Sequence, residues 1–220
     1  MTRPRLLDLF CGAGGAAMGY HRAGFDVVGV DIKPQPHYPF AFIQDDALLF
    51  LGDNVSTFDA IHASPPCQRF SKSVSKRSRE THPDYIAAIR YRLVMSGLPY
   101  VIENVPRAPL REPITLCGSS FGLGVMRHRL FESSEVLYSR EHRHQDYPPQ
   151  YAPAWNRTTP LRFRPISGGW TSDNDHAANM EAMGVDWEMT PRELSESIPP
   201  DYAQWIGRQM LSNIMTGGLS

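Results

Sequence analysis

The sequence predicts an α/β fold, with a mainly parallel β-sheet covered by helices on both faces. Short apolar runs alternate with stretches of helical spacing over residues 1–135, the order expected of parallel strands joined by crossover helices. The first apolar run ends in a glycine-rich turn, Cys11-Gly12-Ala13-Gly14-Gly15. With 220 residues, the chain is long enough to bury a core without disulfide or metal staples.

Apolar runs and the glycines or prolines that end them place the elements of this first part. The expected strands are Leu6–Phe10, Val27–Val30, Phe42–Ile43, Asp59–Ala63 and Tyr100–Ile102, with Pro113–Leu116 and Leu130–Glu132 as two more. A helix is expected over Ala16–Ala23, which stops at Gly24. A second is expected over Pro83–Ser96, where Ile86, Ile89 and Leu93 recur at helical spacing.

The remainder of the chain divides into two further parts. From about residue 138 it is rich in Pro, Arg, Tyr, His and Trp, and its prolines forbid long helices. Helical patterning returns near Asp175, with helices starting at Pro191 and at Pro199-Pro200. We therefore expect a main domain over 1–137, a short irregular region over 138–183, and helices over 184–220 that return to the main domain.

Charge and cysteine content exclude several classes of protein. Lys and Arg number 22 against 23 Asp and Glu, a net charge of −1, so nucleic-acid binding requires local basic patches rather than global attraction. Three cysteines exclude a disulfide framework and indicate a reducing compartment, so we expect a cytoplasmic protein. The run Leu6–Phe10 is too short for a signal peptide or a membrane span, and we expect neither.

The first chemical motif is the segment Asp8–Gly15, at a strand-to-helix turn. Glycines there let a ligand approach the backbone closely. Asp31 ends the next strand, 23 positions after Asp8, about the offset at which a carboxylate accepts hydrogen bonds from a ribose. The spacing differs from G-x-G-x-x-G, so NAD is not the first choice, and an ordinary tight turn is the alternative.

The second motif is Ser64-Pro65-Pro66-Cys67-Gln68, which follows a predicted strand. A cysteine at this place lies where α/β folds bind ligands, and it is a candidate nucleophile whose basic neighbours should favour the thiolate. Five cations and no acid occupy residues 69–79, which suggests a phosphate-bearing substrate. The alternative is a buried structural cysteine followed by a solvated basic loop.

Two further motifs face the same predicted crevice. Glu103, in Glu103-Asn104-Val105, lies at the carboxyl end of a strand, where a carboxyl group can bind the edge of a base or carry a proton. Arg127 and Arg129 are two apart on an extended segment, so both can grip one anionic or carbonyl target. Taken alone, each also fits an ordinary surface residue.

The order and spacing of these motifs resemble those of the DNA cytosine-5 methyltransferases, most of all compact, phage-like members. The resemblance adds Asp46, a late Thr190-Pro191-Arg192-Glu193 and Ile206-Gly207, and touches most of the chain except roughly 138–185. It implies an enzyme with a Rossmann-like, S-adenosylmethionine-dependent methyltransferase fold. The residues it implies for S-adenosylmethionine are Asp8, Phe10, Gly12, Gly14, Gly15, Asp31, Ile32, Asp46 and Pro66, with Asp31 on the ribose and Asp46 on the adenine amino group.

The resemblance also implies catalytic roles and a substrate. Cys67 would add to C6 of a cytosine flipped out of double-stranded DNA, and Glu103 would bind its N3/N4 edge. Arg129 would reach the base's O2, and Arg127 would order the catalytic loop or backbone. The implied DNA-binding residues are Arg69, Ser71, Lys72, Lys76, Arg77, Arg79, Arg157, Arg162 and Arg164, with Trp170 beside them. We expect no metal and a monomer.

The sequence departs from the family pattern at three places. Val125 replaces a frequent Gln, Arg208 replaces the Asn of a late Ile-Gly-Asn, and Ile32 replaces a large aromatic residue, which weakens the expected stacking on adenine. The region available for target recognition is also very short. A small target-recognition region contacts few base pairs, so we expect short or relaxed sequence specificity.

Several alternatives stay open from the sequence alone. A tRNA cytosine methyltransferase shares Ser-Pro-Pro-Cys-Gln but usually adds Cys-Phe-Thr, which is absent here. Free cytosine nucleotides, a non-catalytic DNA-binding module and a thiol hydrolase are other candidates; a hydrolase needs a histidine partner, and only His62 lies in a strand-end motif. Restriction–modification and protection of a phage genome are equally compatible with the sequence.

Overall fold

The computed structural model describes residues 2–71, 75–141, 164, 166 and 176–217. Its centre is a seven-stranded sheet in the order β3-β2-β1-β4-β5-β7-β6. The strands are β1 (Arg5–Leu9), β2 (Asp26–Asp31), β3 (Ala41–Gln44), β4 (Ala60–Ala63), β5 (Tyr100–Asn104), β6 (Ile114–Leu116) and β7 (Arg129–Ser133). Strands β1 to β5 pair in parallel, whereas β7 runs antiparallel to both β5 and β6. The predicted mainly parallel sheet is confirmed.

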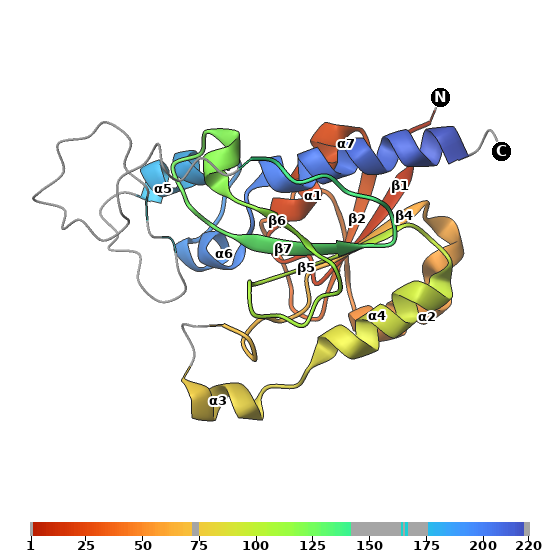
Figure 1. The fold of residues 1–220 in the computed structure, drawn as a ribbon, viewed down its shortest axis with the longest axis horizontal. Coiled ribbons are helices and arrows are strands. Elements are labelled where there is room, and N and C mark those ends of the chain that lie inside the picture. The colour runs from red at the N-terminus through yellow and green to blue at the C-terminus, as the bar shows by residue number, and fades with distance from the viewer. Residues whose placement is uncertain (1, 72–74, 142–163, 165, 167–175, 218–220) are drawn as a thin grey trace, which may run out of the picture.

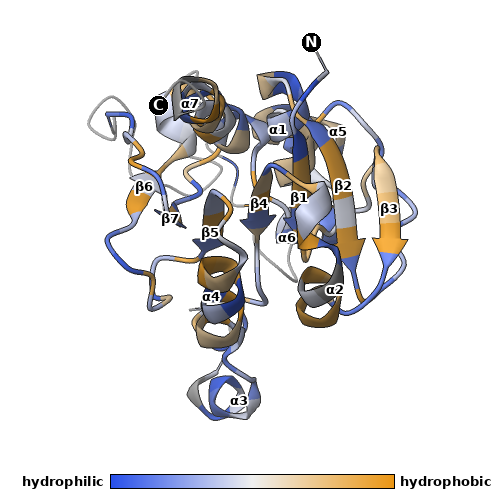
Figure 2. Ribbon diagram, turned by 90° about the vertical axis from the view of Figure 1, so that its right-hand side faces the viewer, coloured by the Kyte–Doolittle hydropathy of each residue, from blue (hydrophilic) through white to orange (hydrophobic). Residues whose placement is uncertain are grey.

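Helices cover both faces of this sheet (Figure 2). Helices α1 (Gly15–Ala23) and α7 (Pro200–Gly217) pack on one face, and α2 (Ala47–Asn54) and α4 (Tyr85–Ser96) on the other. Alternate residues of β1 serve the two layers, since Leu6 belongs to the core under α1 and α7 while Leu7 belongs to the core under α2 and α4. This two-sided burial explains why the strands read as continuous apolar runs rather than alternating ones.

Helices α1 and α7 cross closely because each contributes a glycine to the contact. A Cβ atom on Gly19 would collide with the backbone oxygen of Pro200, and one on Gly207 would lie 2.8 Å from the Cβ of Ala23. The late Ile206-Gly207 pair of the sequence therefore has a packing role. The neighbouring Arg208 is exposed, so its departure from the family pattern changes nothing in this contact.

Three shorter helices lie towards the edges of the molecule (Figure 1). Helix α3 (Lys76–Thr81) stands apart from the sheet in both views, whereas α5 (His176–Met183) and α6 (Pro191–Glu196) lie on the side away from α4. The residues around α5 and α6 form a separate apolar cluster that packs on Ala13 and Val125 of the main domain. Two 3-10 turns, η1 (Val55–Thr57) and η2 (Gly118–Phe121), complete the elements.

Two helices were not predicted from the sequence. Helix α2 begins at Asp46, whose carboxylate accepts hydrogen bonds from the backbone N–H groups of Leu48 and Leu49 as an N-cap. Helix α3 occupies part of the segment that we predicted to be a basic loop, and Ser75 caps it. Both corrections have one cause: each helix is less than three turns long, so neither shows a full period of apolar residues. Within the described residues, no helix is both long and apolar enough to cross a membrane.

A buried ion pair holds the edge of the sheet to α4. Glu132 on β7 binds the Arg90 guanidinium through both oxygens, each at 2.7 Å, and also accepts from the backbone N–H of Arg111. We expect Glu132→Ala to lower the free energy of unfolding by about 3–5 kcal/mol, because it leaves a buried cation unpaired. Urea unfolding measures the change. The control is Glu196→Ala, which breaks the exposed pair with Arg192 and should cost less than about 1 kcal/mol; equal losses in the two variants would contradict the prediction.

Candidate active site

The chemical motifs gather where parallel strands end on either side of β1. Strand β1 lies between β2 and β4. The connection after β1 therefore runs to one side of it, and the connection from β3 to β4 crosses to the other side. Such a switch in strand order opens a crevice at the carboxyl ends of the strands, the usual ligand site of open α/β sheets. The glycine-rich turn after β1, Asp31 at the end of β2, the segment after β4 and Glu103 near the end of β5 all lie at this edge.

The turn after β1 has a backbone suited to close approach of a ligand. Phe10 and Gly12 have left-handed φ angles of 58° and 50°. A side chain on Gly12 would meet no protein atom within 4 Å, so the space above this backbone is open. The N–H of Gly12 donates to Asp31 Oδ2 at 3.1 Å, which ties the turn to the end of β2.

Gly14 and Gly15 serve packing rather than open space. A Cβ atom on Gly14 would lie 2.7 Å from the ring of Pro39, and one on Gly15 would collide with Ser197 and the backbone of Ile198. The turn is also held from outside by Trp187, whose indole N–H donates to the carbonyl of Ala13 at 3.0 Å. These contacts fix the turn between the β2–β3 connection and the segment after α6.

Polar and apolar groups flank the turn on the β2 side. Asp31 accepts from Gly12 and from the backbone N–H of Lys33, one bond on each oxygen, so both oxygens keep lone pairs for further donors. Ile32 is 64% exposed next to it. Asp46 uses Oδ1 for the N-cap of α2, and among the described residues its Oδ2 has no protein donor.

Asp8 lies deeper than a ligand-contacting residue would. It sits inside β1 with no exposed surface, and the hydroxyl of Tyr38 donates to its carboxyl at 3.4 Å. Burial raises the pKa of Asp8 to about 8. This corrects the prediction that Asp8 contacts the cofactor directly: it lies beneath the turn and positions the β2–β3 connection through Tyr38.

The segment after β4 places Cys67 in the crevice. Asn104 at the end of β5 donates from its side chain to the carbonyl of Pro65 at 2.8 Å, so the two strand ends are tied together. The carbonyl of Cys67 accepts from the N–H groups of Phe70 and Ser71, which folds the next residues into a turn. Pro66, just before the cysteine, is half-buried.

The surroundings of the Cys67 thiol favour its protonated form. Burial and the Glu103 carboxylate raise the pKa of the Cys67 thiol above its usual value, while Arg129 and Arg127 act in the opposite direction. This corrects our expectation that basic neighbours favour the thiolate. The basic residues nearest in sequence are not the ones that act on the thiol, and desolvation outweighs the two arginines that do.

Glu103 and Arg129 face each other next to this thiol. Arg129 Nε lies 3.0 Å from Glu103 Oε1, and both side chains are largely buried. Burial raises the pKa of Glu103, opposed by Arg129, by a hydrogen bond from Ser64 and by Arg127. Among the described residues, Glu103 Oε1 accepts no hydrogen bond of good geometry although it is fully buried. A ligand that brings a donor to this oxygen would satisfy it.

Arg127 has a different environment from Arg129. Its guanidinium donates to the carbonyls of Ile166 and Ser195, and the backbone carbonyl of Arg127 accepts from the hydroxyl of Tyr202. Burial and Arg129 lower the pKa of Arg127 to about 9, which leaves it cationic at neutral pH. Arg127 therefore orders the backbone beside the site, which is one of the two roles that the resemblance implies for it.

The predicted DNA-binding residues are distributed over the edges of the molecule. Arg77 is exposed and Arg79 half-buried on α3, and Lys76 begins that helix. The exposed Arg69 donates to the carbonyl of His82 at 2.7 Å, and Arg164 donates to the side chain of Asn179. Ser71 is half-buried in the turn that follows Cys67. Lys72, Arg157, Arg162 and Trp170 lie outside the described residues.

Sequence reasoning missed several residues that shape the site. His37 in the β2–β3 connection contacts Glu193 of α6 at 2.9 Å, and Glu193 also forms a capping box with Thr190. The late Thr190–Glu193 motif thus holds α6 against the connection beside the turn. The capping-box pattern was visible in the sequence, but its partner lies 156 residues away along the chain.

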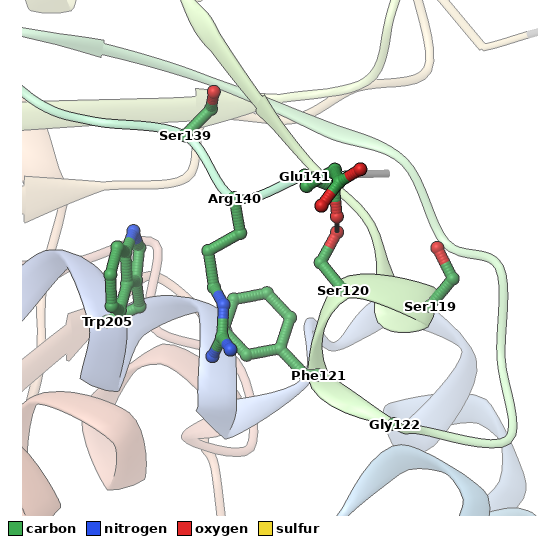
Figure 3. A pocket seen from close by; sticks show the side chains of 8 residues that line it. All are labelled: Ser119, Ser120, Phe121, Gly122, Ser139, Arg140, Glu141 and Trp205. Carbon is green, nitrogen blue, oxygen red and sulfur yellow. Dashed lines mark hydrogen bonds between the residues drawn. The ribbon is translucent and has the colours of Figure 1, made fainter. Parts of the chain in front are cut away.

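A cavity of about 510 Å³ lies away from the crevice, between η2, the segment after β7 and α7. Figure 3 shows the Arg140 guanidinium between the rings of Phe121 and Trp205, with centroid distances of 4.8 and 5.1 Å. None of the predicted site residues lines it. Within the part of the chain that the structure describes, no group of three or more His, Cys, Asp or Glu side chains has metal-binding geometry.

Taken together, a glycine-rich turn at the switch point, a half-buried cysteine and arginine, and a buried glutamate define a class of α/β proteins that hold a nucleotide-like ligand next to a thiol. The family model described as C-5 cytosine-specific DNA methylase matches residues 4–109. The first half of the chain is thus similar to this family.

Curated relatives agree with this family. A Type II methyltransferase, M.XorII of Xanthomonas oryzae pv. oryzae, is 32% identical over 149 residues, which are 60% of this chain and 31% of the relative. M.NgoMIV of Neisseria gonorrhoeae is 30% identical over 108 residues, 45% of this chain and 35% of the relative. The chain thus spans about a third of the length of these relatives.

Solved structures share the fold at low sequence identity. The S. pombe Dnmt2 methyltransferase has a TM-score of 0.59 at 13% identity, over 96% of this chain and 99% of that one. The Entamoeba histolytica methyltransferase EhMeth has a TM-score of 0.57 at 13% identity, over the full length of both. The predicted Rossmann-like methyltransferase fold is confirmed.

Proposed function

We propose that this chain is a DNA cytosine-5 methyltransferase that uses S-adenosylmethionine. The observation that carries the proposal is the meeting of Cys67, Glu103 and Arg129 at the carboxyl ends of β4, β5 and the start of β7, beside the glycine-rich turn. A nucleophile, a group for the N3/N4 edge and a cation for a carbonyl oxygen are what addition to a cytosine ring requires. The Type II methyltransferase relatives support this reading.

The residues around the turn fit S-adenosylmethionine. The open space above Gly12 admits a ligand against the backbone, Asp31 keeps lone pairs on both oxygens for ribose hydroxyls, and Asp46 Oδ2 is available for the adenine amino group. The exposed Ile32 offers an apolar surface to the adenine, and Phe10, by the resemblance, would line the cofactor site beside it. When bound, S-adenosylmethionine supplies an electrophilic methyl group.

The protein's own groups then account for each step. The Cys67 thiol loses its proton to solvent, its sulfur bonds to C6, and N3 takes up a proton from the Glu103 carboxyl, which turns C5 into an enamine-like carbon. Glu103 holds the N3/N4 edge as negative charge develops there, and Arg129 faces O2. C5 would accept the methyl group, which leaves S-adenosylhomocysteine. Loss of the C5 proton to a base, expulsion of Cys67 as a thiolate and return of the N3 proton to Glu103 then restore the ring. Because C6 is inaccessible in a duplex, the cytosine enters flipped out.

We also propose how the chain meets double-stranded DNA. Helix α3 and the turn before it carry cations and project from the body beside the crevice, so they are placed to contact phosphates. The short region 138–183, with Arg157, Arg162 and Arg164, would supply the few base contacts and hence a short or relaxed recognition sequence. Three free cysteines fit the reducing cytoplasm of a bacterial or phage-infected cell, where we place the protein as a monomer.

The proposal is tested with purified protein, radiolabelled S-adenosylmethionine and duplex DNA, followed by bisulfite sequencing. We expect label in the DNA and protected cytosines within a short shared sequence. Parallel reactions with RNA and with free cytosine nucleotides use the same donor. Label in RNA or nucleotides but not in DNA would contradict the proposed substrate, and binding of DNA without any transfer would favour a non-catalytic module.

The pH dependence of the reaction follows from the raised pKa of Cys67. Because the thiol is mostly protonated at neutral pH, kcat/KM should rise with pH, at most tenfold per unit, until the thiol ionises. Asp8, with a pKa of about 8, titrates in the same range, so an Asp8→Asn variant is the control and should keep the slope. A flat profile between about pH 6.5 and 8.5 would contradict the protonated state described here.

A further inference from the structure

A series of hydrogen-bonded, buried polar side chains crosses the α1 face of the sheet, beside the buried Asp8. The Tyr20 hydroxyl on α1 lies 3.0 Å from His62 Nδ1 on β4, and His62 Nε2 lies 2.8 Å from Ser64 Oγ. Tyr20 and His62 have no exposed surface. Three linked polar groups at this depth are costly unless each is satisfied, so their arrangement calls for a physical reason.

This series of hydrogen-bonded side chains leads to the Glu103 carboxyl. Strands β4 and β5 pair in parallel with Ala63 opposite Ile102, so the next residues along, Ser64 and Glu103, lie side by side on the same face. From this position the Ser64 hydroxyl acts on the Glu103 carboxyl as a hydrogen-bond donor that lowers its pKa. Tyr20 is thus connected to the site through two intervening side chains.

The number of protons on each group fixes the direction in which these hydrogen bonds are donated. Burial lowers the pKa of His62 to about 3, so at neutral pH its ring carries one proton. Among the described residues, His62 Nδ1 is the one hydrogen-bond partner of the Tyr20 hydroxyl, which satisfies its donor only if it donates there. His62 Nε2–H then donates to Ser64, whose own hydroxyl proton is left for Glu103.

We propose that Tyr20, His62 and Ser64 are positioning residues, which hold the Glu103 carboxyl in place through hydrogen bonds directed from Tyr20 towards the site. The inference rests on the proposed function, because it assigns a task to Glu103. The Ser64 hydroxyl donates to the Glu103 carboxyl, and Arg129 lies beside Oε1. The carboxyl group therefore cannot rotate freely when a base binds. The neutral His62 sets the direction of donation without adding a charge.

The test replaces Ser64 and measures two quantities. The first is the single-turnover rate of methyl transfer to duplex DNA. The second is the titration midpoint of the Glu103 carboxyl, followed by ¹³C NMR of glutamate-labelled protein and identified by the signal that Glu103→Gln removes. The other groups facing Glu103 are Cys67, Arg127, Arg129 and Tyr20, and all four stay unchanged in the Ser64 variants.

In Ser64→Ala we expect the Glu103 midpoint to move to higher pH, because the lost donor favoured the ionised form, and the rate to fall about tenfold. Ser64→Thr keeps a hydroxyl and should restore both. Tyr20→Phe keeps the ring packing but removes the first donor, and should shift both quantities in the same direction by a smaller amount. The control is Ser134→Ala, at the opposite end of β5, which should alter neither.

The outcomes separate this inference from the proposed function. An active wild-type protein whose Glu103 midpoint and rate are unchanged in Ser64→Ala would overturn the inference and leave the function intact. A shifted midpoint in a protein that transfers no methyl group to any cytosine would support the hydrogen-bond chain and overturn the function. Thermal unfolding of each variant confirms that a folded protein is compared.

Discussion

Cys67→Ala is expected to abolish methyl transfer, with a fall in rate of roughly 10⁴-fold or more, the scale seen when a covalent nucleophile is removed. The physical reason is that C5 of cytosine gains no nucleophilic character without addition at C6. The thiol lies in the crevice rather than in the apolar core, so its loss should leave the fold unchanged. The rate is measured by transfer of labelled methyl groups at saturating DNA and donor.

The matched control is Cys117→Ala. Cys117 is another cysteine outside any disulfide, fully buried after β6 and outside the crevice. Activity per folded molecule should be retained in this variant, whatever its cost in stability. A Cys67→Ala protein with more than about 1% of wild-type transfer would rule out the nucleophile assigned here.

Glu103→Gln is expected to lower the rate by about 10²–10⁴-fold, the usual contribution of a positioned acid–base group. The amide has the size of the carboxyl but cannot take up a negative charge or exchange a proton with N3. Because Glu103 pairs with Arg129 at the ends of β5 and β7, binding of the methyl donor at the turn after β1 should be unaffected. Quenched single-turnover assays measure the rate of methyl transfer, and titration with the methyl donor measures its binding.

A second glutamate serves as the control for this substitution. Glu135 follows β7 at the far end of the sheet from the crevice, and Glu135→Gln should preserve the rate. If Glu103→Gln weakened donor binding and left the transfer rate unchanged, Glu103 would belong to the donor site and not to the base site.

Local patterns were sufficient for most of the fold. Each predicted strand is present with ends within a few residues, because a strand buried on both faces leaves an apolar run that a glycine or proline ends. The direction of β7 carries no such local signal, since pairing with β5 and β6 is decided by partners far away in the sequence. Asp46 shows a further limit: we interpreted it as a ligand residue, and it is also the N-cap of α2.

The candidate site was predictable as a set of motifs but not as a set of energies. Spacing placed Cys67, Glu103 and Arg129 at neighbouring strand ends, where they lie. The spacing of the motifs does not reveal how deeply each residue is buried. Burial reverses the expected effect on the Cys67 pKa and removes Asp8 from the surface. His62 illustrates the same point: the sequence places it in a strand-end motif, and only the geometry connects it, through Ser64, to Glu103.

The most direct test of the central claim is to trap the covalent intermediate. Duplex DNA with 5-fluorocytosine allows addition of Cys67 at C6 and methyl transfer to C5, but the fluorine on C5 cannot leave as a proton does. With S-adenosylmethionine present, we expect a stable protein–DNA adduct whose cross-linked peptide contains Cys67. Trapping at another residue, or methylation of normal cytosine without any adduct on the fluorinated base, would contradict the account.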